Sequence, residues 1–517
     1  MSQPSLPAPS VNLVFTNTVV PVTASRMLTF LGLGSWLGVA ALLRWSCSRG
    51  EIWLDEVWTW DISHQLTWPG GLFYELREEN NHYLNTLIVW WLKDQPAVWF
   101  RLPAVLFGVA SVRVAWSLGR ANPHRGELTG WLAAGLTATS YLMVHYSSEA
   151  RGYAYAVFFA ALAYHQLLVL ETCRQRGSDL SPRESRISRT STWLFPLACC
   201  GGFLSQPIFL TCFGAMVVWI FLRLRRQVPE ESEWPTLLRY FFCPGAFFVV
   251  LYLVDLRYAV NGGGDQYPLW RVVMETLSLI GGGPFAGWGA AVVAGLVLGA
   301  FGQGLRVLAR ANDDRWIFYV LVVVVMPLGL LVVLRRAEVY PRYFLIAVFF
   351  LIQAAAVGLA DLLRRGTVAR LVAVVSLVTV MWGNGQHLRR LADLGRGGYL
   401  PILESIPFQE PLPVIHLRTD NPFRHPLMFK YLLPEADLQG KTLDVVTPDR
   451  VPTAGTEWIL THNLDVYWQP PQTLTTQEIA YDLRVFRPYA GLSGWGLALY
   501  RRRAPDPAKP PPPIDPP

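Results

Sequence analysis

Long apolar runs separated by short polar loops dominate the first three quarters of the chain. Runs near 20 residues, the length that crosses a bilayer, recur from Met27–Trp45 to Val368–Trp382. A soluble protein would give its amphipathic helices a polar face, and Val320–Leu334 and Leu371–Trp382 have none. The pattern therefore predicts an all-α, polytopic membrane unit with about eleven transmembrane helices.

The predicted spans lie near residues 27–45, 102–118, 128–144, 153–170, 193–204, 208–222, 237–254, 290–305, 316–334, 344–360 and 368–382. The apolar segment Tyr83–Leu92 is too short to cross alone, so we expect it to lie partly in the membrane. Asp255–Gly287 is expected to be a long loop with two glycine runs, Gly262–Gly264 and Gly281–Gly283.

The composition changes after Asn384. Four short apolar runs alternate with polar turns, and Phe423–Leu433 is helix-like, which is typical of a small α/β domain. The runs are Val414–Leu417, Leu443–Val446, Trp458–Leu460 and Gly496–Tyr500. The predicted organisation is a disordered cytoplasmic tail (1–25), a membrane domain (26–384), an α/β domain (385–503) and a disordered Pro-rich tail (504–517).

Composition and charge support this organisation and indicate an orientation. The 517 residues are 52% hydrophobic and 16% charged, against about 25% charged in soluble domains. The formal charge of +7 does not indicate nucleic-acid binding, because the arginines gather in short loops between predicted spans. Such loops stay cytoplasmic, so we expect a multi-pass inner-membrane protein with a cytoplasmic N-terminus and an exported C-terminal domain.

Cysteine and histidine give no strong metal signal. The six cysteines lie in or beside apolar spans and show no paired C-x-x-C spacing. His82 and Glu149 are weak candidates for a divalent-metal site, because two ligands without diagnostic spacing are little evidence. The histidines at 145, 165, 387, 416, 425 and 462 show no clustering pattern.

Asp55 and Glu56 form an acidic pair just beyond the first span. A carboxylate at the membrane face can accept a proton from a hydroxyl group and make it a nucleophile. Neighbouring residues of a helix point about 100° apart, so the two carboxylates are not expected to share one role. An ordinary interfacial charge that marks the end of a span is the alternative.

Two further charged loops lie on the same predicted side as the acidic pair. Glu149 and Arg151 occupy a short turn between two spans, and Arg342 lies in Pro341-Arg342-Tyr343 at the start of another. Arginine offers a fork of donors suited to phosphate, so an anionic lipid headgroup is one ligand to expect. A surface ion pair for Arg151 and snorkelling for Arg342 are the alternatives.

Five short motifs occur in a recognisable order. They are Trp53-Leu54-Asp55-Glu56, Asn80-Asn81-His82-Tyr83-Leu84, Arg101-Leu102-Pro103-Ala104, Tyr146-Ser147-Ser148-Glu149-Ala150-Arg151-Gly152-Tyr153 and Pro341-Arg342-Tyr343. The series resembles the bacterial GT-C glycosyltransferases that are dolichyl-phosphate-mannose-protein mannosyltransferase-like and related to the aminoarabinose lipid A transferase. The resemblance covers roughly residues 27–385.

The resemblance implies roles for particular residues. Asp55 resembles the catalytic base and Glu56 its companion, while Arg151 and Arg342 match positions where donor-phosphate contacts are expected. Glu149 matches an acidic position of the second exported loop. His82 and Tyr343 fall within motifs that would contribute to substrate binding. His82-Tyr83-Leu84 and Ser148 depart from the commoner His-Pro-Pro and Gln, which leaves metal dependence and sugar choice open.

The resemblance implies an inverting transferase that uses a polyprenyl-phosphate-linked sugar and an exported-side lipid, glycan or protein acceptor. A polyprenyl phosphate leaves readily, so transfer needs one base and cationic groups rather than the two carboxylates of glycoside hydrolysis. No cofactor is certain from the sequence, and a divalent metal ion is left open. A lipid-linked-saccharide transporter or flippase, or a non-catalytic membrane assembly protein, remains the alternative.

Overall fold

The structure is a computed structural model of the whole chain. It describes residues 22–78, 80–92, 95–122, 126–177, 179–227, 233–259, 266–334, 339–406, 414–435, 442–448, 456–476 and 478–504. The chain divides into two compact units. A helical unit comprises residues 1–49 and 59–389, and a C-terminal unit comprises residues 390–517 together with 50–58.

The helical unit contains α1, the helices α3 to α15 and most of α16. They are α1 (Val22–Cys47), α3 (Tyr83–Leu92), α4 (Ala97–Arg120), α5 (Gly126–Thr139), α6 (Tyr141–Tyr146), α7 (Tyr153–Arg176), α8 (Pro182–Ser205), α9 (Phe209–Gln227), α10 (Trp234–Val254), α11 (Leu269–Ile280), α12 (Trp288–Arg310), α13 (Arg315–Val320), α14 (Met326–Leu334), α15 (Leu345–Leu363) and α16 (Thr367–Leu394). Short turns are η1 (Pro69–Phe73), η2 (Leu256–Tyr258), the π-helical η3 (Leu321–Val325) and η4 (Pro341–Phe344). Helix α2 (Leu54–Gln65) begins in the C-terminal unit and ends in the helical unit.

Each predicted span corresponds to helix in the structure. Among the described residues, eight helices are long and apolar enough to cross a membrane. The predicted span at 128–144 is divided at Ser140 into α5 and α6, and the spans in α8 and α9 fall outside those eight. The prediction of a polytopic helical membrane protein is therefore confirmed, and α3 is the short apolar helix expected at Tyr83–Leu92.

One predicted loop contains a helix. Residues 255–287 include α11, whose apolar face is buried through Val272, Leu279 and Ile280. The flanking glycines had favoured a loop, but the sequence between them has helical amphipathicity, and burial of its apolar face stabilises the helix. The first glycine run, Gly262–Gly264, lies outside the described residues.

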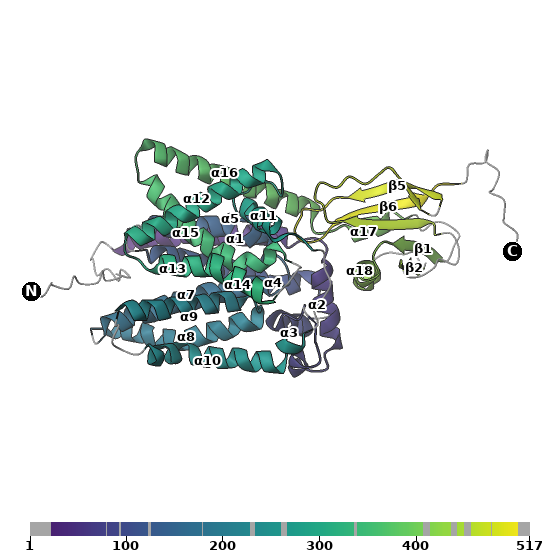
Figure 1. Cartoon of the computed structure of the whole chain (residues 1–517). Coiled ribbons are helices and arrows are strands. Elements are labelled where there is room, and N and C mark those ends of the chain that lie inside the picture. Colours follow the sequence, from purple (N-terminus) through teal and green to yellow (C-terminus); the bar gives the residue numbers. More distant parts are fainter. Residues whose placement is uncertain are drawn as a thin grey trace, which may run out of the picture. The chain divides into compact units, whose positions relative to one another are not determined.

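Small residues allow the helices to approach closely. Between α12 and α15, a Cβ atom added at Gly304 would lie 1.9 Å from the Ala354 carbonyl oxygen, and one at Gly358 would lie 2.5 Å from that of Ala300. Such small-residue contacts are typical of membrane helix pairs, which associate by close packing. Helices α7, α8, α9 and α10 lie side by side in the same unit (Figure 1).

The C-terminal unit is built on one mixed sheet of six strands in the order β2-β1-β3-β6-β5-β4. The strands are β1 (Val414–Thr419), β2 (Thr442–Val446), β3 (Trp458–Asn463), β4 (Thr473–Thr476), β5 (Ile479–Arg487) and β6 (Gly496–Arg502), with α17 (Tyr399–Glu404), α18 (Arg424–Leu432) and η5 (Leu433–Glu435). β1 pairs in parallel with β2 and β3, and the remaining pairs are antiparallel.

The four predicted strands and the predicted helix are present as β1, β2, β3, β6 and α18. β4 and β5 were missed, because β4 has no buried residue and β5 has only one, Tyr481. A strand that buries so little of either face carries no clear alternation of apolar and polar residues. The tail segment Pro510–Pro513 and most of the predicted N-terminal tail lie outside the described residues, while α1 already begins at Val22.

Candidate functional site

The acidic pair lies at the start of α2, where the two carboxylates have different surroundings. The side chain of Glu56 accepts a hydrogen bond from the backbone N–H of Trp53 at 3.2 Å. This contact is one of the two hydrogen bonds of a capping box, the one in which the third residue of the helix accepts from the backbone N–H of the N-cap residue. It satisfies one of the N–H groups that have no intrahelical partner at a helix start. Asp55 is 8% exposed and Glu56 is 1% exposed. Glu56 therefore stabilises the beginning of the helix that carries Asp55.

The acidic segment is held firmly within the C-terminal unit. Glu51 accepts hydrogen bonds from the backbone N–H groups of Tyr399 at 2.8 Å and Leu400 at 3.1 Å, at the N-terminus of α17. The ring of Trp58 packs edge-on against that of Phe423, with centroids 5.3 Å apart. Burial raises the pKa of the Glu51 carboxyl. Sequence reasoning missed Glu51, since its partners lie about 350 residues further along the chain.

In the helical unit, His82 is held by groups from distant segments. The backbone N–H of Gly152 donates to His82 Nδ1 at 3.1 Å, and the amide of Gln206 lies 3.0 Å from Nε2. Because an N–H group can only donate, Nδ1 is an acceptor and a neutral ring carries its proton on Nε2. The amide oxygen of Gln206 is then the atom that accepts from it. Gln206 lies between α8 and α9, and it was not among the residues named from the sequence.

The electrostatics agree with a neutral His82. Burial lowers the pKa of His82 well below its usual value of 6.5, and the positive charges of Arg151 and Arg342 lower it further. Desolvation disfavours the imidazolium ion, and so does each neighbouring cation. His82 therefore supplies a fixed hydrogen-bonding group beside two arginines.

Arg151 is 3% exposed, and an amide and an aromatic ring are among the groups that it contacts. Its guanidinium donates to Asn80 Oδ1 at 2.8 Å, lies 3.5 Å from His82 Nε2 and lies over the Tyr153 ring at 5.0 Å. Asn80 in turn donates from Nδ2 to the hydroxyl of Thr59 at 3.0 Å. The second and fourth sequence motifs thus meet at Arg151.

Arg342 joins the same cluster from η4. Its guanidinium lies over the rings of Tyr340 and Tyr343, at 4.4 and 5.7 Å from their centroids. Its charge acts on His82 and also on Tyr146. The predicted residues His82, Glu149, Arg151, Arg342 and Tyr343 therefore belong to one region of the helical unit, which we call the Arg151 end.

Glu149 is fully buried within the turn between α6 and α7. Its carboxylate lies 3.0 Å from Nε2 of His145, which is also fully buried. The turn is fixed from α3, where Asn85 Nδ2 donates to the Ala150 carbonyl at 2.7 Å. The buried Glu149–His145 contact holds the turn that presents Arg151. The metal site suggested for His82 and Glu149 stays a prediction, and an ion there would compete with these contacts.

Arg44 is a further buried residue that sequence reasoning missed. It is 1% exposed and donates to the carbonyl groups of Thr137 at 3.3 Å and Ala138 at 3.1 Å. These carbonyl groups belong to the last turn of α5, and carbonyl groups at the end of a helix have no N–H partner within the helix. Arg44 also lines a cavity large enough for about one water molecule, beside Tyr146 and Tyr153. It therefore supports the α5–α6 break that precedes the Glu149 turn.

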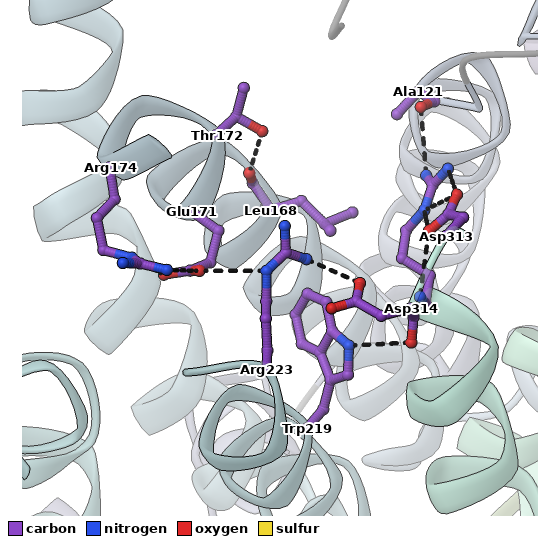
Figure 2. Close-up of polar contacts among 10 residues, drawn as sticks. Ala121, Leu168, Glu171, Thr172, Arg174, Trp219, Arg223, Asp313 and Asp314 are labelled. Carbon is purple, nitrogen blue, oxygen red and sulfur yellow. Dashed lines mark hydrogen bonds and ion pairs between the residues drawn. The ribbon is translucent and has the colours of Figure 1, made fainter. Parts of the chain in front are cut away.

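The opposite end of α7 carries a different set of charges, which we call the Arg223 end (Figure 2). Arg223 lies 3.5 Å from the Glu171 carboxylate and donates to Asp314 at 2.9 Å, while Arg174 pairs with Glu171 at 2.9 Å. Nearby, Arg315 donates from Nε to Asp313 at 2.8 Å and from Nη1 to the Ala121 carbonyl at 3.2 Å. These pairs connect α4, α7, α9 and the α12–α13 turn.

No protein-family model matches the sequence, and no curated protein matches it. Several solved structures are similar in fold. ArnT from Cupriavidus metallidurans in the apo state is 12% identical, with a TM-score of 0.49 and coverage of 82% of this chain and 86% of ArnT. The same protein bound to undecaprenyl phosphate gives 12% identity, a TM-score of 0.49 and coverage of 92% and 98%.

An oligosaccharyltransferase from Archaeoglobus fulgidus, tethered with an acceptor peptide, is also similar. It is 12% identical, with a TM-score of 0.45 and coverage of 83% of this chain and 69% of that protein. At these scores the likeness concerns the fold alone.

Proposed function

We propose that this chain is an inverting membrane glycosyltransferase. It takes a sugar from a polyprenyl-phosphate-linked donor and moves it to an acceptor on the exported side of the inner membrane. In this orientation the N-terminus is cytoplasmic and the C-terminal unit is exported. The acceptor is a lipid, a glycan or a protein.

The observation that supports this function best is the convergence at the Arg151 end. Arg151 and Arg342 come from segments about 190 residues apart, and the charge of each lowers the pKa of the same histidine. Two guanidinium groups close to the same position can stabilise the negative charge that develops on a departing phosphate. Amide, imidazole and phenol groups are among the residues around them and help to fix the geometry of this region.

Asp55 is the proposed base, which takes the proton of the acceptor hydroxyl as that oxygen attacks the anomeric carbon. The bond to the phosphate oxygen breaks in the same displacement, and the phosphate leaves with the electron pair. Arg151 and Arg342 stabilise that phosphate, and Tyr343 holds Arg342 in place. Glu56 supports Asp55 through its contact with the Trp53 N–H, and Glu149 supports Arg151 through the turn.

Native mass spectrometry of the gently solubilised protein tests the phosphate assignment. Undecaprenyl phosphate is titrated against the wild type, Arg342→Ala and Arg310→Ala. Arg310 is an exposed arginine at the end of α12, so its variant controls for general attraction to lipid headgroups. We expect Arg342→Ala to weaken binding by about 10- to 100-fold, which is the loss of a charge-assisted contact, and Arg310→Ala to bind as the wild type does.

Co-purified lipid gives a second readout in the same experiment. A bound species with the mass of a polyprenyl phosphate plus a sugar would identify the donor. Equal affinity for undecaprenyl phosphate in all three proteins would assign Arg342 to the structure and remove the main support for a polyprenyl-phosphate donor.

A further inference from the structure

Three side chains with metal-ligating groups meet in the C-terminal unit. Each of Asp420, His425 and His462 offers one ligand atom, and these atoms all lie within 4.8 Å of one another. The sequence had indicated no clustering for His425 and His462, and that prediction was wrong. The residues are up to 42 positions apart, and the pairing of the strands brings them together.

The topology of the sheet explains why the three metal-ligating side chains lie close together. β1 and β3 run in parallel, so their carboxyl ends lie at the same edge of the sheet, where α/β proteins bind ligands. Asp420 directly follows β1, and His462 lies near the end of β3. Asn421 Oδ1 accepts from the N–H groups of Phe423 at 3.0 Å and Arg424 at 2.8 Å, which turns the chain into α18.

The carboxylate of Asp420 is the centre of the cluster. Its Oδ1 atom lies 2.8 Å from His425 Nε2 and 2.8 Å from His462 Nδ1. Its Oδ2 atom accepts the backbone N–H of His462 at 2.8 Å, so the side chain has a fixed rotamer. The His425 side chain is fully buried, whereas those of His462 and Asp420 are 13% and 31% exposed. The cluster therefore has one open side.

We propose that Asp420, His425 and His462 bind one divalent transition-metal ion of the zinc type. Two imidazoles and a carboxylate are ligands that zinc prefers, and three protein ligands leave a fourth position for water or another ligand. Zinc bonds of about 2.0–2.1 Å at tetrahedral angles place ligand atoms about 3.3 Å apart. Each 2.8 Å contact therefore opens by about 0.5 Å when the ion enters.

The surroundings of His425 suit a metal ligand. The Tyr399 hydroxyl lies 2.9 Å from His425 Nδ1 and accepts from Trp495 Nε1 at 3.0 Å. A ligating histidine donates its second N–H to such an acceptor, which fixes the ring orientation. With the ion on Nε2, the proton of His425 lies on Nδ1 and points at the Tyr399 oxygen.

The guanidinium group of Arg424 disfavours binding of a metal ion at this cluster. Its Nη1 atom lies 2.6 Å from His462 Nε2, and its guanidinium lies over the Trp495 ring at 5.4 Å. When the ion binds Nδ1 of His462, the ring proton lies on Nε2, which can then no longer accept a hydrogen bond from Arg424. The positive charge of the ion also repels the guanidinium group. The guanidinium therefore turns away on binding, so that removal of Arg424 strengthens the site.

Zinc titration of the full-length protein tests the proposal. Tag-free protein in detergent is stripped with chelator and titrated with ZnCl₂, and the bound metal is counted by elemental analysis. We expect one Zn²⁺ per chain, at least about 10- to 100-fold weaker binding in His462→Gln, and tighter binding in Arg424→Gln. Co²⁺ in place of Zn²⁺ should give the visible absorption of a tetrahedral site.

His416→Gln is the matched control. His416 Nδ1 also contacts a carboxylate, that of Asp444 at 2.9 Å, but this pair is exposed, and among the described residues it does not form part of a three-ligand cluster. The control should bind zinc as the wild type does, and circular dichroism should show the same fold for all variants. No stoichiometric zinc in the wild type, or equal zinc in His462→Gln, would overturn the proposal and leave the cluster as a hydrogen-bonded network.

Discussion

The two ends of α7 hold their arginines in different ways. At the Arg223 end, Arg223, Arg174 and Arg315 are oriented by the carboxylates of Glu171, Asp313 and Asp314. At the Arg151 end, the contacts of Arg151 and Arg342 include an amide oxygen and tyrosine rings. About 27 Å of helix, from Tyr153 to Glu171, separates the two sets.

This difference in contacts indicates that the Arg223 end has a structural role and supports the catalytic role proposed for the Arg151 end. Paired charges within a protein hold elements together, and removal of one partner leaves the other buried and uncompensated. At the Arg151 end, the positive charges of both arginines act on one neighbouring group, as the lowered pKa of His82 indicates. Variants at the Arg223 end should therefore cost stability, and variants in the proposed catalytic groups should cost activity.

The largest effect is expected for Asp55→Asn. The amide keeps the shape of the side chain but cannot accept the acceptor's proton, so turnover should fall by about 10²- to 10⁴-fold. Insertion and the thermal midpoint should stay near those of the wild type, since the Glu56 cap is intact. The measurement is turnover with the donor found by mass spectrometry, beside a melting curve. Full turnover in this variant would remove Asp55 from the role of base.

Arg223→Ala should produce the opposite result. The substitution leaves Glu171 without Arg223 and breaks the contact of Arg223 with Asp314, which connects α9 to the α12–α13 turn. Breaking a buried pair costs about 3 kcal/mol, so the thermal midpoint in detergent should fall clearly. Binding of undecaprenyl phosphate by the remaining folded protein should not change. A stable Arg223→Ala protein with weakened lipid binding would reverse the comparison.

Sequence reasoning predicted the elements better than the contacts. The spans, α3 and four of the six strands follow from local runs of apolar residues, whose periodicity needs no partner to be seen. Glu51 and Gln206 could not be found in this way, because their function depends on residues far away in the sequence. The Asp420 cluster escaped for the same reason. His82, Arg151 and Arg342 were named from motifs, and only the fold brings them together.

The dependence of stability on pH tests whether His82 stays neutral in the folded protein. In the folded state its pKa lies well below 6.5, whereas the unfolded chain has the ordinary value. Below pH 6.5 the unfolded state therefore binds a proton that the folded state does not, and the free energy of unfolding decreases as the pH falls. This contribution to stability is present above pH 6.5 and is lost toward the folded pKa.

The prediction is checked with His82→Asn, whose side-chain oxygen can still accept from the Gly152 N–H but does not titrate. The thermal midpoint of the wild type should fall between pH 7 and pH 5, and that of His82→Asn should fall less. His64→Asn is the control for replacing a histidine elsewhere in the chain, because His64 is exposed on α2. The same slope in all three proteins would mean that His82 accepts a proton in the folded state.

The smallest expected effect concerns Glu56, and it tests whether the acidic pair has one role or two. Gln at position 56 still offers an oxygen to the Trp53 N–H, so Glu56→Gln should keep both the cap and most of the turnover. Ala removes the oxygen, and Glu56→Ala should lower the free energy of unfolding by about 1 kcal/mol. Each variant is measured by thermal melting and turnover beside Asp55→Asn. If Glu56→Gln instead loses as much turnover as Asp55→Asn, the negative charge of Glu56 takes part in the reaction, and the cap is not its main role.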